Sequence, residues 1–124
     1  MTSWIALPPE DTADGELRIA YERIRKERGA VANVYKIHAT RPATMLAHLD
    51  LYKSLLFTAS ELTRLERELI ATVVSAVNRC EYCTYHHSVP LRQLMHDDAL
   101  VDRIIANPEQ VELTPRWRAI VDVA

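Results

Sequence analysis

Glycine is scarce in this chain, with 2 residues among 124. Few positions can form the tight turns of a many-stranded sheet, so long helices are easier to build. No apolar run approaches the ~20 residues that span a bilayer. The N-terminus also lacks a basic segment followed by an apolar one, which would indicate a signal peptide. We therefore expect a cytoplasmic protein with no membrane contact.

Neither sign of charge is in excess, since 15 Lys and Arg residues face 17 Asp and Glu residues. The formal net charge is −2, which gives no basic field to attract nucleic acid or anionic lipid. One basic cluster contains interspersed Glu22 and Glu27, and this pattern favours a solvated helix face. The cluster comprises Arg23, Arg25, Lys26 and Arg28. We expect no nucleic-acid partner.

The length of 124 residues predicts a single domain over residues 1–124. A domain of this size buries only a modest core, so association between copies of the chain would stabilise it.

Apolar residues recur at helical spacing along most of the chain, while no segment alternates for long enough to indicate a sheet. The predicted fold class is all-α, with about six helices. Residues 1–12 are predicted to form an extended arm, and the secondary structure of residues 31–41 is ambiguous. The predicted helices run from about Asp14 to Arg28, from near Pro42 to Thr58, from a cap at Thr63 through Val77, from Glu81 or Tyr82 to Met95, from a cap at Asp97 or Asp98 through Ile105, and from Thr114-Pro115, as N-cap and first helical position, to the end.

The helix over residues 64–77 carries the clearest signal. Thr63 followed by Glu66 is a capping-box pattern. Its apolar positions are too many for an ordinary strand, although several are β-branched. They are Leu65, Leu69, Ile70, Val73, Val74 and Val77. In the next helix, Pro90 predicts a kink.

Cys80 and Cys83 form a C-x-x-C pair at the predicted start of that next helix. The spacing brings two sulfur atoms within bridging reach, and the helix N-terminus stabilises a thiolate. His87 lies one turn beyond Cys83, where an imidazole can take a proton from a thiol. Glu68, on the preceding helix, can orient His87 or relay its proton. These residues predict a redox-active thiol pair.

Two other interpretations of the cysteines stay open at this point. Cys80, Cys83 and His87 are possible zinc ligands, with Glu68 or His86 as a fourth, although structural zinc usually joins two separated ligand pairs. The cysteines can also be incidental, and Glu68 can simply pair with Arg64 or Arg67. His38, His48 and His96 are interpreted as surface or packing residues.

The segment from Glu68 to His87 resembles the signature of the alkylhydroperoxidase D-like proteins of the carboxymuconolactone decarboxylase superfamily. The pattern is a glutamate, eleven residues, C-x-x-C, three residues and a histidine, and every spacing matches. Pro42 and the Leu113–Arg116 segment also resemble the peroxidase-related branch of these proteins.

The resemblance implies an all-α fold that assembles as a homo-oligomer, a trimer or a hexamer. It also implies reduction of a hydroperoxide by a dithiol, which is then restored by a thiol or disulfide electron donor. Cys80 and Cys83 would be the redox pair, His87 the base and Glu68 the relay. Cys83 is favoured as the attacking thiol because His87 is its (i, i+4) partner, and Cys80, nearer the helix end, is the alternative. No cofactor and no metal are implied.

Two departures from the family pattern bear on this expectation. The best-studied pattern has a histidine just before the second cysteine, where this chain has Tyr82. Related chains also continue with further helices beyond Ala124, so we expect either a truncated form or completion by a neighbouring subunit. The apolar residues that would need such cover are Trp117, Ile120 and Val121.

Three functions follow from these residues and the resemblance. A thiol peroxidase accounts for the cysteine pair, the histidine and the glutamate together. A carboxymuconolactone decarboxylase-like lyase does not require a C-x-x-C. A non-catalytic helical oligomer would use the cysteines to bind zinc or to sense oxidation. We expect the peroxidase.

Overall fold

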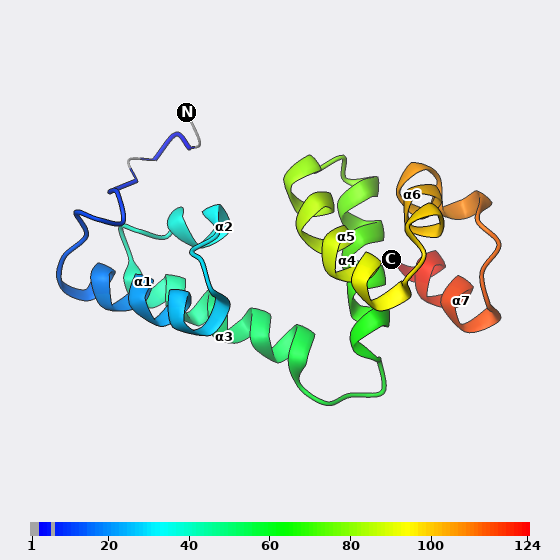
Figure 1. The fold of residues 1–124 in the computed structure, drawn as a ribbon, viewed down its shortest axis with the longest axis horizontal. Helices are drawn as coiled ribbons and strands as arrows, with labels where there is room; N and C mark the ends of the chain where they lie inside the picture. Colours follow the sequence, from blue (N-terminus) through cyan, green and yellow to red (C-terminus); the bar gives the residue numbers. More distant parts are fainter. Residues whose placement is uncertain (1–2, 6) are drawn as a thin grey trace. The chain divides into compact units, whose positions relative to one another are not determined.

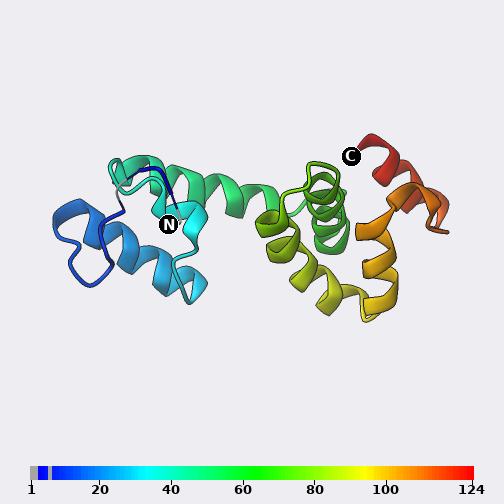
Figure 2. The same cartoon turned by 90° about the horizontal axis from the view of Figure 1, so that it is seen from above.

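The computed structural model describes residues 3–5 and 7–124, and within these residues it is entirely helical. The predicted all-α class is confirmed. The elements, drawn in Figures 1 and 2, are α1 (Gly15–Arg28), α2 (Asn33–Lys36), α3 (Pro42–Phe57), α4 (Arg64–Val77), α5 (Glu81–Met95), α6 (Asp98–Ala106), the 3₁₀ helix η1 (Pro108–Gln110) and α7 (Pro115–Val123).

The chain forms two compact units, one within residues 1–55 and one within residues 56–124. The sequence-based expectation of one domain over residues 1–124 stays a prediction. No described helix is long and apolar enough to cross a membrane.

The first unit has its own apolar core, built by residues from α1, α2 and α3. Its fully buried members include Tyr21, Ile24, Met45 and Leu49. α1 ends at Gly29, whose φ of 83° lies in the region that glycine adopts without strain. The ambiguous segment after it contains the four-residue helix α2, which is too short for periodicity to reveal.

Two members of the basic cluster of α1, Arg23 and Arg25, pair with acidic groups within the first unit. Arg23 contacts Glu27 at 2.9 Å and Asp50 at 2.5 Å, and Arg25 contacts Glu10 at 2.5 Å. These exposed ion pairs fit the predicted solvated helix face.

The second unit is organised around α4, which packs against α5, α6 and α7. The predicted capping box is confirmed, because Thr63 Oγ1 accepts from the Glu66 amide and Glu66 Oε2 accepts from the Thr63 amide. Leu69 and Val73 lie in the core of this unit. By contrast, Val77 at the end of α4 is 63% exposed, so the buried face is narrower than the apolar pattern.

α6 is capped by the first of its two candidate cap residues, and α7 begins at its predicted cap. Asp97 accepts from the Leu100 amide at the start of α6, and Thr114 accepts from the Trp117 amide at the start of α7. α5 continues through Pro90 to Met95; the kink stays a prediction. The apolar side chains of α7 pack on the core of this unit: Val121 is buried, and Trp117 and Ile120 lie against it.

Candidate functional site

Cys80 and Cys83 are joined by a disulfide at the N-terminus of α5, with their Cα atoms 5.3 Å apart. Both residues are partly exposed. The two predicted cysteines are therefore brought together, and a solution reagent has access to them.

The connection between α4 and α5 explains the position of Cys80. The amide of Arg79 bonds to the Ala76 carbonyl and the amide of Cys80 to the Ser75 carbonyl, which is a Schellman motif at the end of α4. Arg79 takes the left-handed conformation this motif requires, with φ of 55°. Cys80 then becomes the N-cap of α5, and its sulfur accepts from the Cys83 amide at 3.2 Å.

A helix N-terminus stabilises a thiolate, because free amides and the helix dipole present positive charge to the sulfur. The Cys83 amide already points at Cys80 Sγ in the disulfide form. This donor to Cys80 is a feature that the sequence did not reveal. It acts on the cysteine that the sequence analysis did not favour as the attacking thiol.

His87 and Glu68 form a direct contact between α5 and α4, with His87 Nδ1 2.8 Å from Glu68 Oε2. The Glu68 side chain is 0% exposed, whereas that of His87 is 25% exposed. Because an ionised carboxylate only accepts, the hydrogen bond requires the proton to lie on Nδ1 of a neutral imidazole or on both nitrogens. The sequence could not establish whether Glu68 and His87 lie close together, and the structure places them in hydrogen-bond contact.

The second oxygen of Glu68 faces Arg64, one turn earlier on α4. Arg64 Nη1 and Glu68 Oε1 form an ion pair, and both atoms are shielded from solvent. The sequence offered Arg64 or Arg67 as the partner. Arg67 donates instead to the carbonyls of Leu62 and Thr58 in the connection that precedes α4.

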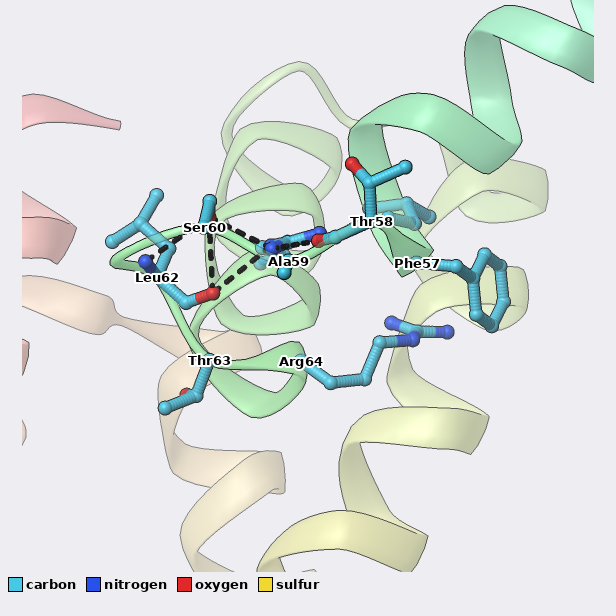
Figure 3. Close-up of a pocket in the computed structure, with 9 residues that line it drawn as sticks. Phe57, Thr58, Ala59, Ser60, Leu62, Thr63 and Arg64 are labelled. Atoms are coloured by element: carbon cyan, nitrogen blue, oxygen red, sulfur yellow. Dashed lines mark hydrogen bonds between the residues drawn. The ribbon is translucent and has the colours of Figure 1, made fainter.

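A cavity of about 420 Å³ lies where the connection between α3 and α4 meets the start of α4. It was not predicted from the sequence. Arg64 is on its wall (Figure 3). The same side chain forms the ion pair with the Glu68 carboxylate, so it borders both the cavity and that group. Its lining is Leu56, Phe57, Thr58, Ala59, Ser60, Leu62, Thr63, Arg64 and Arg67.

The other predicted histidines lie outside this arrangement. His86 is exposed and its ring stacks near Tyr82, with the centroids 4.3 Å apart. His38 and His48 contact each other in the first unit, at 3.0 Å between ring nitrogens. Burial, followed by the charge of His38, lowers the pKa of His48. His96 caps the C-terminus of α5.

The zinc interpretation gains no support from the described part of the chain. Within residues 3–5 and 7–124, no group of three or more His, Cys, Asp or Glu side chains is arranged to hold a metal ion. In the disulfide form the two sulfur atoms bond to each other.

A helical unit with a C-x-x-C pair at a helix N-terminus, beside a buried glutamate–histidine contact, is typical of dithiol redox proteins. The model of the carboxymuconolactone decarboxylase family matches residues 42–124. The chain therefore belongs to the carboxymuconolactone decarboxylase family, and it is an alkylhydroperoxidase D-like protein within that superfamily. None of the curated proteins compared with the chain matches it.

Solved structures support the same assignment. An uncharacterized peroxidase-related protein from Silicibacter sp. TM1040 is 34% identical, with a TM-score of 0.81 over 96% of this chain and 62% of that one. An alkylhydroperoxidase AhpD core, an uncharacterized peroxidase-related protein from Ralstonia eutropha JMP134, is 28% identical, with a TM-score of 0.78 over 95% and 62%. This chain therefore spans about 62% of the length of each.

A third structure shows the fold alone. The alkylhydroperoxidase AhpD core from Rhodospirillum rubrum ATCC 11170 is 24% identical, with a TM-score of 0.66 over 93% of this chain and 96% of that one. The family and the fold are thus shown. The roles of Glu68, Cys80, Cys83 and His87 stay predictions.

Proposed function

We propose that this protein is a thiol peroxidase that reduces a hydroperoxide with the Cys80–Cys83 dithiol. The observation that carries the proposal is the disulfide-bonded pair at the start of α5, one turn from a histidine that is itself held by a buried glutamate. The peroxidase-related descriptions of the two structures with higher identity agree with it.

The proposed cycle starts from the reduced pair. His87 accepts the thiol proton of Cys83, and the thiolate attacks the terminal oxygen of the hydroperoxide. The O–O bond breaks as the S–O bond forms, leaving a sulfenic acid on Cys83. The alkoxide takes up a proton and leaves as the alcohol.

Cys80 resolves this intermediate. Its thiolate attacks the Cys83 sulfur, the S–S bond forms, and the S–O bond breaks with release of water. Two thiols and one hydroperoxide thereby give one disulfide, one alcohol and one water. An external dithiol then restores the pair by thiol–disulfide exchange. The disulfide between Cys80 and Cys83 corresponds to the oxidised end of this cycle.

Cys83 is assigned the attack because His87 lies one turn beyond it on the same helix. The amide donor at Cys80 Sγ is the observation in favour of the reverse assignment. Single Cys80→Ser and Cys83→Ser variants separate the two, since only the variant that retains the attacking thiol forms a sulfenic acid with peroxide.

The test of the function is peroxide-driven loss of free thiols in reduced, reductant-free protein near neutral pH. We expect stoichiometric formation of the Cys80–Cys83 disulfide, slowed by roughly 100-fold or more in His87→Ala, as expected for loss of a general base. His86→Ala is the matched control, because the neighbouring imidazole is exposed and should leave the rate unchanged.

Thiols that stay unreacted with hydrogen peroxide and with alkyl hydroperoxides would reject the proposal. Lactone decarboxylation that survives in the Cys80→Ser, Cys83→Ser double variant would favour the lyase instead. Zinc that co-purifies and releases the thiols on chelation would favour the metal-binding oligomer.

A further inference from the structure

Arg64 is held in place by two contacts within the second unit. Its guanidinium pairs with Glu68 Oε1 on one side. On the other, its Cζ lies 4.4 Å from the centroid of the Phe57 ring. Figure 3 shows the two side chains next to each other. The side chain is only 27% exposed. A cation over an aromatic face is attracted by the ring and loses little freedom there, so the guanidinium is pre-organised toward the carboxylate.

The Glu68 carboxylate is shared between one cation and one imidazole. Oε1 faces Arg64, and Oε2 faces His87 Nδ1 at 2.8 Å. Among the described residues, these are the charged or titratable groups recorded in contact with it, one from α4 and one from α5. A carboxylate that is 0% exposed stays ionised only when such partners replace water.

The ionisation of Glu68 decides what His87 can do. An ionised carboxylate accepts from Nδ1–H, which places the lone pair of the neutral imidazole on Nε2. A protonated Glu68 would donate to Nδ1 and force the opposite tautomer. An unpaired buried carboxylate would instead draw a proton onto the imidazole, and the base would already be occupied.

We propose that Arg64 is a positioning residue that keeps Glu68 ionised and thereby holds His87 as the Nδ1–H tautomer with a free Nε2. The inference rests on the proposed function for its catalytic consequence. The tautomer itself does not depend on any activity of the protein.

The first measurement is the nitrogen NMR spectrum of the His87 imidazole in the wild-type chain above neutral pH. We expect Nδ1 to carry the proton and Nε2 to show the lone-pair shift. The opposite tautomer in wild-type protein would overturn the proposal, whatever the variants do. This measurement also remains decisive if the peroxidase proposal fails.

The second measurement compares Arg64→Met with Arg64→Lys in the reaction of the reduced thiols with peroxide or with an alkylating reagent, as a function of pH. Loss of the neighbouring cation should move the acidic limb of the rate profile upward by about one pH unit or more. The Lys variant, which keeps the charge, should restore most of the wild-type profile.

Arg92→Met is the matched control. Arg92 also forms an ion pair in the second unit, with Asp102 at 2.5 Å, and its loss should leave the profile unchanged. An Arg64→Met protein with wild-type tautomer and wild-type pH profile would refute the proposal. So would an Arg92→Met protein that shifts as much as Arg64→Met, because a general loss of stability would then explain both.

Discussion

Reduction of the Cys80–Cys83 disulfide should destabilise the second unit only slightly. The bond joins residues three apart, so the closed loop contains four residues. Chain entropy for a loop of four gives a stabilisation of about 1.9 kcal/mol, compared with about 3 kcal/mol for a fifteen-residue loop. The hydrogen bond from the Cys83 amide to Cys80 sulfur can persist in the dithiol, so the α5 N-cap remains.

The assay is denaturant unfolding of the oxidised and reduced protein, followed by Trp117 fluorescence in a Trp4→Phe background. Trp117 reports on the second unit, whereas Trp4 is 99% exposed and belongs to the first. We expect a loss of about 2 kcal/mol or less in the free energy of unfolding, with helix content unchanged. The Cys80→Ser, Cys83→Ser double variant should have the unfolding free energy of the reduced protein, with or without a reducing agent.

A loss above about 4 kcal/mol, or a loss of helix on reduction, would refute this reasoning, since it would exceed what so short a loop can contribute. The pair would then be a structural staple rather than a bond that can open and close during turnover. The loss of unfolding free energy on reduction therefore bears directly on the proposed function.

Three further predictions concern stability. Hydrogen bonds from Arg116, then from the Thr63 amide, lower the Glu66 pKa to about 2 from an ordinary 4.5. The ionised Glu66 therefore stabilises the fold fully above pH 4.5, and this contribution is lost as pH falls toward 2. The stability of Glu66→Gln should fall less than that of the wild type over this pH range, and an equal fall in both proteins would contradict the prediction. Thr72→Val should raise the unfolding free energy of the oxidised protein by about 1 kcal/mol, because the buried Thr72 hydroxyl has no hydrogen-bond partner among residues 3–5 and 7–124. A lower unfolding free energy of this variant in chemical denaturation would contradict the prediction. Arg79→Gly should gain about 1 kcal/mol by relieving a left-handed φ of 55°, and an unchanged thermal midpoint would count against it.

The sequence predicts helix ends well, because capping is settled by groups three or four residues apart. The Thr63–Glu66 box and the Thr114 cap form as expected, and of the two candidates Asp97 and Asp98 it is Asp97 that caps α6. The two missed elements, α2 and η1, have four and three residues. Neither is long enough for an apolar period to appear.

The site is predictable only where it depends on one helix. Cys83 and His87 share a face of α5 because they are four residues apart. The contact of His87 with Glu68 depends on how α4 packs on α5. The sequence places Glu68 beside an apolar face but does not say which neighbour covers that face.

The choice between Arg64 and Arg67 shows the same limit. Arg64 precedes Glu68 by four residues and meets it on one face, whereas adjacent helical residues point in different directions. That much follows from spacing. The anchoring of Arg64 by Phe57, and the use of Arg67 to hold the Thr58 and Leu62 carbonyls, depends on the path of the connection between α3 and α4. No local pattern encodes that path.

The position of Cys80 would allow the proposed redox cycle to proceed without disturbing the rest of the site. Its amide closes the Schellman motif of α4, while its sulfur caps α5, so one residue fixes where α4 ends and where α5 begins. Opening the disulfide changes the sulfur but leaves the amide bond to the Ser75 carbonyl intact. The two helices therefore keep their register, and the Glu68–His87 contact between them should persist in both redox states. In the proposed cycle, His87 would therefore be in place for the dithiol each time the pair is reduced.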